Sequence, residues 1–382
     1  MKRVLFITRH YLDENNGGSN CTKANIRAIA ELYDDVTLIY PEHTGVDSSY
    51  YAPKGVMPIP CYDNRKRWQK GLDVYRGRLH RAINFVKQHI SENKYDIVII
   101  DHSLAANGVI KAINRTGAKI ITIHHNNESE YIKDNMPSWL YRIPFVYYVK
   151  RTEREALLLS DLNVTLTEHD AQTFRNWYPD KDIHCYNMGT YQWQDIPKTI
   201  DDDGIIHCKT FAITGSLNFL QSQKPIIDFI EQYYPILQKI IPEAKLIIAG
   251  RNPSRSIVAA CRRYQGIKLI PNPEDMGTVI KQADIYICPV NRGSGVKLRV
   301  MDGLKLGIPV LGHSVAANGY ETIKNDGYFF EYYDKGSFEK ALYAISELNY
   351  NRQDVYESFS HYFCFQAGKE RLRDILKKVK LI

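Results

Sequence analysis

The chain has 382 residues, of which 44% are hydrophobic and 24% are charged, and its formal net charge is +7. This composition is ordinary for a globular protein, and the length is comfortable for two domains. No run of about 18 apolar residues occurs, so we expect no membrane-spanning helix. The short apolar run at residues 4–8 predicts a first strand and is too short for the core of a signal peptide.

The cysteines indicate the redox environment of the protein, and the net charge indicates the charge of its partner. The seven cysteines are scattered and form no Cys-x-x-Cys pair. Reduced thiols in a cytoplasmic protein are the simplest account of them. The positive excess suits an anionic partner, namely a nucleoside diphosphate, a phospholipid headgroup or a nucleic acid, and does not choose among them.

The first elements predict a parallel sheet. Apolar runs at residues 4–8 and 36–40 read as strands, and a helical pattern at residues 24–32 lies between them. This β-α-β unit is typical of parallel α/β domains. Gly17 and Gly18 precede the helix, where they could let a phosphate or a sugar approach the backbone. The alternative is a flexible loop.

Residues 64–89 are strongly basic, with eight Lys and Arg residues against the single acid Asp73. Apolar residues recur in this segment at roughly helical spacing and predict one amphipathic helix. Such a helix could lie on an anionic membrane, at about 1 kcal/mol per basic residue. It could equally be an ordinary helix with its apolar side in the core. Nucleic-acid binding is a third reading, but no RNA- or DNA-binding signature accompanies the charge.

Polar residues that could take part in catalysis or binding follow the strand expected at residues 119–123. His124, His125 and Glu128 stand there, after an earlier strand at residues 95–101. The carboxyl ends of parallel strands are where α/β folds place ligands. A metal site is not expected, because no third ligand can be identified. A helix at 151–159 and a strand at 162–167 continue the alternation and read as structure.

A change of character at residues 189–208 predicts a linker between two domains. Its three aspartates, at 201–203, read as a solvated acidic turn and not as a metal site. The strand pattern restarts at residues 211–215. We expect an N-terminal domain at 1–195, a C-terminal domain at 196–355, and a final helix at 356–382 that returns to the N-terminal domain.

The second half repeats the alternation. We expect a helix at 226–240 and a strand at 245–250, which Arg251 follows. Further strands are expected at 268–273 and 283–289, a polar loop at 313–321, and a basic amphipathic helix at 371–380.

The stretch at 285–310 carries the most specific pattern. A buried strand, a loop with Gly295, and a helical pattern from residue 296 onward form a geometry that binds phosphate. Lys297 and Arg299 fall in the expected first turn, where cations oppose the helix dipole unless an anion is bound. Asp302 could accept hydrogen bonds from the hydroxyls of a ribose. The alternative is a surface helix with solvated charges, since the loop matches neither the dinucleotide fingerprint nor a Walker A motif.

Residues 293–310, Gly-Ser-Gly-Val-Lys-Leu-Arg-Val-Met-Asp-Gly-Leu-Lys-Leu-Gly-Ile-Pro-Val, resemble the nucleotide-sugar motif of GT-B glycosyltransferases, in particular retaining family 4. The resemblance implies that Lys297 and Arg299 hold the donor diphosphate, with Gly295 in the loop, and that Asp302 holds the ribose. The chain departs from the family motif twice. Asp302 stands where Glu is usual, and Ser294 replaces the first acid of the two-glutamate pattern.

Other segments are similar to the same family. His125 and Glu128, with Asn126, match its His-Asn-x-Glu, which implies a catalytic position near the transferred sugar or the acceptor. Gly17 and Gly18 match a glycine pair that faces the cleft in such enzymes. Arg251, within the match at 250–253, is implied as a further diphosphate ligand, and a structural salt bridge is the alternative.

The resemblance therefore implies an α/β protein of the GT-B class, with two Rossmann-like domains facing each other across a central cleft. We expect a hexosyltransferase-type glycosyltransferase that moves a sugar from a nucleoside-diphosphate sugar to a saccharide or lipid-linked acceptor, in surface polysaccharide biosynthesis and with retention. No metal and no cofactor beyond the nucleotide sugar are expected, and no nucleic-acid partner. We expect a cytoplasmic location, with peripheral contact to the inner face of an anionic membrane as a further hypothesis. The alternatives are a nucleotide-sugar 2-epimerase of the same fold and a non-catalytic nucleotide-sugar-binding protein.

Overall fold

The computed structural model describes residues 2–63, 65–80, 82–135, 139–197, 199–200, 205–218 and 220–382. The chain folds into two compact units. The first unit contains Met1–Asp195, Gly293–Gly295 and Phe363–Ile382, and the second contains Ile196–Arg292 and Val296–Tyr362. The aspartates at 201–203, which were expected in an acidic turn, lie outside the described residues.

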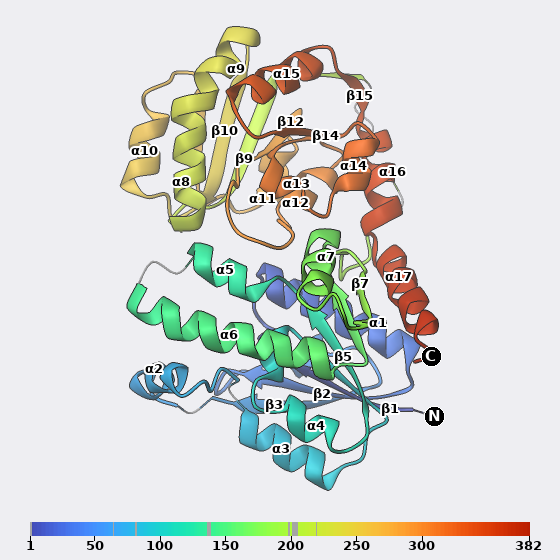
Figure 1. Ribbon diagram of the computed structural model, residues 1–382. Helices are drawn as coiled ribbons and strands as arrows, with labels where there is room; N and C mark the ends of the chain where they lie inside the picture. Colours follow the sequence, from blue (N-terminus) through green and yellow to red (C-terminus); the bar gives the residue numbers. More distant parts are fainter. Residues whose placement is uncertain are drawn as a thin grey trace. The chain divides into compact units, whose positions relative to one another are not determined.

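The first unit is built on a seven-stranded parallel sheet with the order β3-β2-β1-β4-β5-β6-β7 (Figure 1). Its strands are β1 (Arg3–Thr8), β2 (Asp35–Glu42), β3 (Val56–Tyr62), β4 (Ile97–Asp101), β5 (Lys119–His124), β6 (Leu162–Thr165) and β7 (Cys185–Asn187). Its α-helices are α1 (Gly17–Leu32), α2 (Arg67–Tyr75), α3 (Ile83–Glu92), α4 (Ile110–Asn114), α5 (Glu128–Asn135), α6 (Trp139–Leu159), α7 (Glu168–Asn176) and α17 (Phe365–Lys378).

Alternating apolar side chains of β1 and β4 hold helices against this sheet. Leu5 and Ile7 point to one face of the sheet because successive residues of a strand point to opposite faces. They belong to a buried cluster with Val98 and Ile100 of β4 and with residues of α3 and α4, such as Val86. Burial of these side chains fixes the two central strands and therefore the residues that follow them.

The last helix, α17, packs beside α1 in the first unit (Figure 1). The Lys369 ammonium lies 2.7 Å from the Glu31 carboxylate of α1. The Arg371 guanidinium donates hydrogen bonds to the carbonyl oxygens of Met188 (2.6 Å) and Thr190 (3.1 Å). The basic side of this helix is therefore partly used for packing.

The second unit contains a six-stranded parallel sheet with the order β11-β10-β9-β12-β13-β14. Its strands are β9 (Thr210–Ser216), β10 (Lys245–Arg251), β11 (Ile267–Pro271), β12 (Ile285–Cys288), β13 (Val310–His313) and β14 (Phe329–Tyr332); β8 (Ile205–His207) pairs separately with β15 (Asn349–Asn351). Its α-helices are α8 (Leu220–Asp228), α9 (Tyr234–Ile240), α10 (Arg255–Cys261), α11 (Met276–Ile280), α12 (Val300–Leu304), α13 (Ser314–Ala317), α14 (Glu321–Asn325), α15 (Lys335–Ser346) and α16 (Arg352–Phe363).

Both sheets have the strand order of a Rossmann fold, 3-2-1-4-5-6, with one additional strand in the first unit. The prediction of two Rossmann-like α/β domains is confirmed. In this topology the connections change direction between the first and fourth strands. That point lies between β1 and β4 in the first unit and between β9 and β12 in the second. Ligands of such folds bind at the carboxyl ends of the strands at this point.

The single helix predicted over residues 64–89 is wrong. The segment forms α2 and α3, separated by a turn at Gly77, which has φ 67°. Arg78 N donates to the Asp73 carbonyl oxygen at 2.8 Å, the bond that closes a Schellman motif after a helix. Arg81, counted among the basic residues, lies outside the described residues.

Three other predicted boundaries differ from the structure. The helix expected at 226–240 is α8, a π-helical turn at Phe229–Tyr233, and α9. Pro235, near the start of α9, lacks the N–H that a continuous α-helix would use. The helix expected at 151–159 begins at Trp139, and Pro144 inside it obscured the pattern. The loop expected at 313–321 contains α13, whose first turn is capped by the His313 side chain.

Candidate active site

The candidate donor site of the second unit lies at the carboxyl ends of β9 and β12. The Arg299 guanidinium covers Gly215 near the end of β9, since a Cβ atom built on Gly215 would lie 2.5–2.7 Å from its atoms. Any larger residue at 215 would therefore displace Arg299. The guanidinium forms no hydrogen bond or ion pair with another described side chain. The structure thus places a cation at the end of β9, beside the point between β9 and β12 where the chain connections change direction.

A second cation ends the neighbouring strand, β10. Gly250 pairs with Gly215, and a Cβ atom on Gly250 would lie 1.7 Å from the Gly215 carbonyl oxygen, so the two strands need glycine here. Arg251 comes next, opposite Ser216, and its side chain is exposed. Within the described part of the chain the Arg251 side chain forms no ion pair. The salt-bridge alternative is not seen there, and its role as a donor ligand stays a prediction.

The helix predicted to begin at residue 296 begins later, and this corrects the electrostatic argument. Helix α12 starts at Val300 with Arg299 at its N-cap. Residues 297–299 form turns whose carbonyl groups accept three-residue hydrogen bonds, such as Val300 N to Lys297 O at 2.9 Å. Lys297 and Arg299 therefore precede the first helical turn. The charged residue in that turn is Asp302, and a negative charge there is favoured by the helix dipole.

Packing fixes this segment against the sheet. The Tyr320 hydroxyl donates to the Lys297 carbonyl oxygen at 3.1 Å. A Cβ atom on Gly303 would lie 2.6 Å from Tyr286 of β12, so α12 sits directly on that strand. The Asp302 carboxylate pairs with Lys305 at 2.8 Å, and the two side chains are 40% and 39% exposed. Gly295 has φ 73°, a left-handed conformation that favours glycine.

In the first unit, three imidazoles gather at the carboxyl ends of β1, β4 and β5. His10, His102 and His125 have ring centroids 5.1–5.3 Å apart, and the His10 and His125 rings are stacked at 14°. We call these three residues the histidine cluster. It lies where the strand order of the first sheet reverses, and His125 was the only member predicted from the sequence.

Asp101, the last residue of β4, anchors His125. The His125 Nε2 lies 3.0 Å from Asp101 Oδ1, and the carboxylate is fully buried. It also accepts hydrogen bonds from Thr8 (3.1 Å), Thr22 and Asn25 (2.8 Å). Burial alone would raise the pKa of Asp101, but the His125 charge and these hydrogen bonds outweigh burial and hold it well below its usual range. Asp101 is therefore ionised, and it orients the imidazole.

His102 is paired with Glu128 at 3.1 Å. Burial lowers the pKa of His102, and the charge of Glu128 opposes that effect. The pKa of Glu128 is about 2 because the charge and hydrogen bond of His102 outweigh its burial. His102 has φ 78° and ψ 119°, a strained conformation for a residue with a side chain. Strain of this kind is common at functional sites.

Glu153 of α6 holds the start of the helix that carries Glu128. Its two carboxyl oxygens accept hydrogen bonds from the backbone N–H groups of Glu128 (2.6 Å) and Ser129 (3.0 Å). The side chain is fully buried, and burial together with the charge of Glu128 raises its pKa to about 8. The helix containing Glu153 was read from the sequence as structure only.

The glycine pair opens α1. Gly17 is its first residue, and the Asn16 side chain caps it by accepting a hydrogen bond from Ser19 N at 3.0 Å. A Cβ atom on Gly18 would lie 2.3–2.8 Å from the His10 ring, so Gly18 provides the space for that imidazole. A contact of the pair with phosphate or sugar stays a prediction.

The sequence reasoning missed His10, Asp101, His102 and Glu153. The first three carried a usable signal, because each follows or ends an apolar strand of the kind that marked His125. Glu153 carried none. His124, the other histidine at the end of β5, points away from the histidine cluster's partners and into the core. Its Nε2 lies 3.0 Å from Asn163 Oδ1, and burial lowers its pKa to about 4, so it is a core residue beside β6.

The described residues lack two further features. They contain no group of three or more His, Cys, Asp and Glu side chains arranged to hold a metal ion. Among the same residues, no helix is both long and apolar enough to cross a membrane.

Comparison with known proteins identifies the family. Residues 15–187 match the model described as Glycosyltransferase Family 4, and residues 208–347 match the model described as Glycosyl transferases group 1. A protein from Klebsiella pneumoniae, described as an uncharacterized 44.6 kDa protein in cps region, is 24% identical over 386 residues, covering 90% of this chain and 93% of its own.

Solved structures share the fold at low sequence identity. The lipopolysaccharide outer core galactosyltransferase WaaB in its apo form has a TM-score of 0.66 and 12% identity, covering 98% of this chain and 99% of its own. HepE from Anabaena in complex with UDP has a TM-score of 0.64 and 11% identity, covering 98% of this chain and 100% of its own. The two family models both describe glycosyltransferases and together match residues 15–187 and 208–347, and the solved structures share the fold, so the protein belongs to the group 1 glycosyltransferases of the GT-B fold.

Proposed function

We propose that the protein transfers a sugar from a nucleoside-diphosphate sugar to a saccharide or lipid-linked acceptor, with retention of anomeric configuration. The second unit binds the donor, and no metal or further cofactor takes part. The observation that carries the proposal is the Arg299 guanidinium over Gly215, where the strand order of the second sheet reverses.

The charge of the leaving group is the main demand of this reaction. A departing nucleoside diphosphate develops negative charge that donors in the site must stabilise. Arg299 and Arg251 at neighbouring strand ends, with Lys297 two residues before Arg299, supply positive charge for it. We propose that Asp302 binds the ribose hydroxyls. Its pair with Lys305 is half-exposed, and such pairs contribute only about 0–1 kcal/mol, so a ligand can replace it.

We assign the histidine cluster and Glu128 to the transferred sugar and the acceptor. His125 Nε2 lies 3.0 Å from Oδ1 of the ionised Asp101, so Nδ1 is the ring nitrogen left to contact a substrate. His125 Nδ1 and His10 Nε2 are buried and have no hydrogen-bond partner among the described residues. Buried polar atoms normally have one. A sugar hydroxyl of the bound substrate is the partner we propose for His125 Nδ1.

Two relatives support a role in surface polysaccharide assembly. The Klebsiella pneumoniae protein comes from a cps region, and WaaB is a lipopolysaccharide galactosyltransferase. The complexes of HepE with UDP, and with UDP and glucose, support a nucleotide-sugar donor. We propose that the protein works in the cytoplasm, in peripheral contact with the anionic inner face of the membrane.

A thermal-shift screen with UDP, GDP, ADP and their common sugars tests the donor site. A ligand at a hundred times its Kd adds about 2.7 kcal/mol of stability. We expect one nucleotide family to stabilise the wild type and the control Arg262→Ala, an exposed arginine of the same unit, but not Lys297→Ala or Arg299→Ala. Turnover of either site variant should fall about 10²–10³-fold. The absence of a shift with every nucleotide would contradict the donor site.

Assays with the donor found in this screen then distinguish the alternative functions. Formation of an epimerised nucleotide sugar without any acceptor would identify a 2-epimerase. Binding of the donor without its consumption, with every acceptor offered, would identify a non-catalytic binding protein. That candidate rests on Ser294, which stands where the first acid of the family motif is expected. Transfer with inversion would refute the retaining part of the proposal.

A further inference from the structure

Helix α2 presents its apolar side to solvent. Trp68, Leu72 and Tyr75 lie at i, i+4 and i+7 and are 62%, 43% and 49% exposed. The inward side instead carries Asp73, which is buried and pairs with Arg65 at 2.8 Å. This polarity is the reverse of an ordinary surface helix. The expectation of a helix with its apolar side in the core is therefore wrong for α2.

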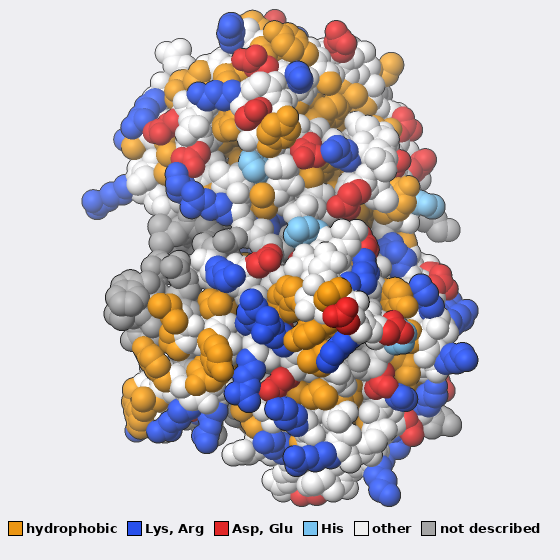
Figure 2. Space-filling model, viewed as in Figure 1, with side chains coloured by type: hydrophobic (Ala, Val, Ile, Leu, Met, Phe, Trp, Pro, Cys, Tyr) orange, Lys and Arg blue, Asp and Glu red, His pale blue; other side chains and the backbone are white. Residues whose placement is uncertain are grey.

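The outer side of α6 extends this apolar surface. Ile143 and Tyr147, one turn apart, are 63% and 61% exposed. The Tyr148 hydroxyl donates to the Tyr75 carbonyl oxygen at 3.0 Å and joins the two helices. We call Trp68, Leu72, Tyr75, Ile143 and Tyr147 the apolar patch. Figure 2 shows hydrophobic side chains gathered over α2 and the adjoining part of α6.

Cationic side chains border the patch. Arg76 and Arg78 follow α2 and are exposed, and neither forms an ion pair with a described residue. On α6, Arg151 continues the stripe of Ile143 and Tyr147 one turn further on.

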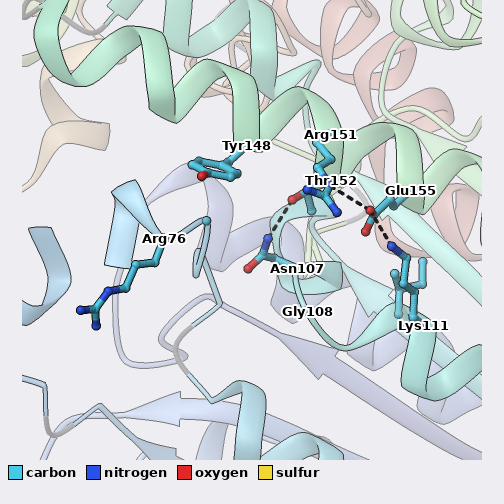
Figure 3. Close-up of a pocket in the computed structure, with 10 residues that line it drawn as sticks. Arg76, Asn107, Gly108, Lys111, Tyr148, Arg151, Thr152 and Glu155 are labelled. Carbon is cyan, nitrogen blue, oxygen red and sulfur yellow. Dashed lines mark hydrogen bonds and ion pairs between the residues drawn. The ribbon is translucent and has the colours of Figure 1, made fainter. Parts of the chain in front are cut away.

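A pocket at this border is cationic as well (Figure 3). Its lining includes Arg76, Lys111 and Arg151, and the last two share the Glu155 carboxylate at 2.9 and 3.1 Å. Arg76 extends away from that pair in Figure 3. Three cations against one carboxylate give the pocket a positive charge.

We infer that the apolar patch and its cationic border are the surface by which the protein docks on an anionic lipid bilayer. This inference deepens the membrane contact proposed above by naming the residues that make it. Tyrosine and tryptophan side chains insert at the boundary between headgroups and acyl chains, while lysine and arginine side chains bind anionic headgroups. A second copy of the chain is a poorer occupant, because the cationic border and the net charge of +7 would repel it.

Sedimentation of the full chain with vesicles tests the surface. One set of vesicles contains phosphatidylglycerol and phosphatidylcholine, and the other contains phosphatidylcholine alone. We expect binding to the anionic set only, and weaker binding as salt is added. Arg76→Gln with Arg78→Gln should lower the affinity about 25-fold, since each basic residue near an anionic surface contributes about fivefold. Trp68→Ser with Tyr147→Ser should lower it by about tenfold or more.

Matched controls lie in the second unit. Tyr343→Ser removes an equally exposed tyrosine, 59% exposed on α15, and Arg255→Gln with Arg262→Gln removes two exposed charges at the start of α10 and just after its end. Tyr343→Ser should leave the affinity for anionic vesicles unchanged. The double arginine variant should lower it only by the effect of the reduced net charge of the protein. The nucleotide-induced thermal shift is measured on every variant. An unchanged shift shows that the variant is folded and keeps the donor site, which separates failure of the docking surface from failure of the proposed function.

Three outcomes would overturn the inference. One is wild-type protein that does not sediment with anionic vesicles, and another is equal binding by the patch variants and the wild type. The third is a dimer, seen by light scattering, that the patch variants abolish while no vesicle binding is found. That result would make a second copy the occupant.

Discussion

Substitution of Gly18 by alanine should disable the histidine cluster without unfolding the protein. The new Cβ atom would lie 2.3 Å from the nearest atom of the His10 ring, whereas ordinary contacts begin at 3.4 Å. The imidazole must therefore move by roughly 1 Å or more, and a misplacement of that size can reduce turnover about 10²-fold. The backbone itself should tolerate the change, because alanine favours a helix more than glycine does.

The assay is release of the nucleoside diphosphate from the donor found in the thermal-shift screen. Gly336→Ala is the matched control, because Gly336 is also the second residue of a helix and its Cβ would meet only Asp334 Oδ1, at an ordinary contact distance of 3.8 Å. We expect this control to keep wild-type turnover. We expect the turnover of Gly18→Ala to fall to that of His10→Ala.

The double variant decides whether Gly18 acts through His10. If it does, Gly18→Ala should have no further effect in a His10→Ala background, because the two changes remove one interaction. An equal loss in both backgrounds would refute the reasoning. So would full activity of Gly18→Ala together with a wild-type melting temperature.

Two further predictions concern buried carboxyl groups. The raised pKa of Glu153, about 8, means that its stabilising contribution is complete below the unfolded pKa near 4.5 and is lost as the pH rises through about 8. Denaturant titrations from pH 5 to 9 should show the wild type losing stability relative to Glu153→Gln, by at most about 1.4 kcal/mol per pH unit, and parallel curves would contradict this. The lowered pKa of Asp101 has the opposite sign, so its contribution is present above its unfolded pKa and is lost only in strong acid. Asp101→Ala should therefore destabilise the protein by about 3–5 kcal/mol at pH 7, as urea denaturation would show, whereas a cost below about 1 kcal/mol would argue against the buried pair.

The amino-acid sequence by itself determined the two-domain α/β fold and the family. Apolar runs alternating with helical patterns are local features, and a β-α-β order leaves a parallel sheet as the natural arrangement. The segment at 293–310 and the residues His125 and Glu128 are also local, since each motif lies within one strand end and the loop after it. These features are visible without knowing which strands are neighbours.

The tertiary structure alone decided which strand ends meet. The order β3-β2-β1-β4 places His10, after β1, beside Asp101 and His102, although about ninety residues separate them in the chain. The same is true of Arg299 over Gly215. No spacing in the sequence encodes such pairs, because they depend on how the strands are ordered and not on local periodicity.

Helix polarity and helix starts were likewise decided by packing. The apolar positions of α2 have a helical period whether they face the core or the solvent, and the pairing of the buried Asp73 with the partly buried Arg65 selects the outward direction. The start of α12 at Val300 depends on turns at 297–299 and on the contact of Gly303 with Tyr286. Periodicity gives the spacing of side chains along an element, but the partners that bury one side of it come from distant parts of the chain.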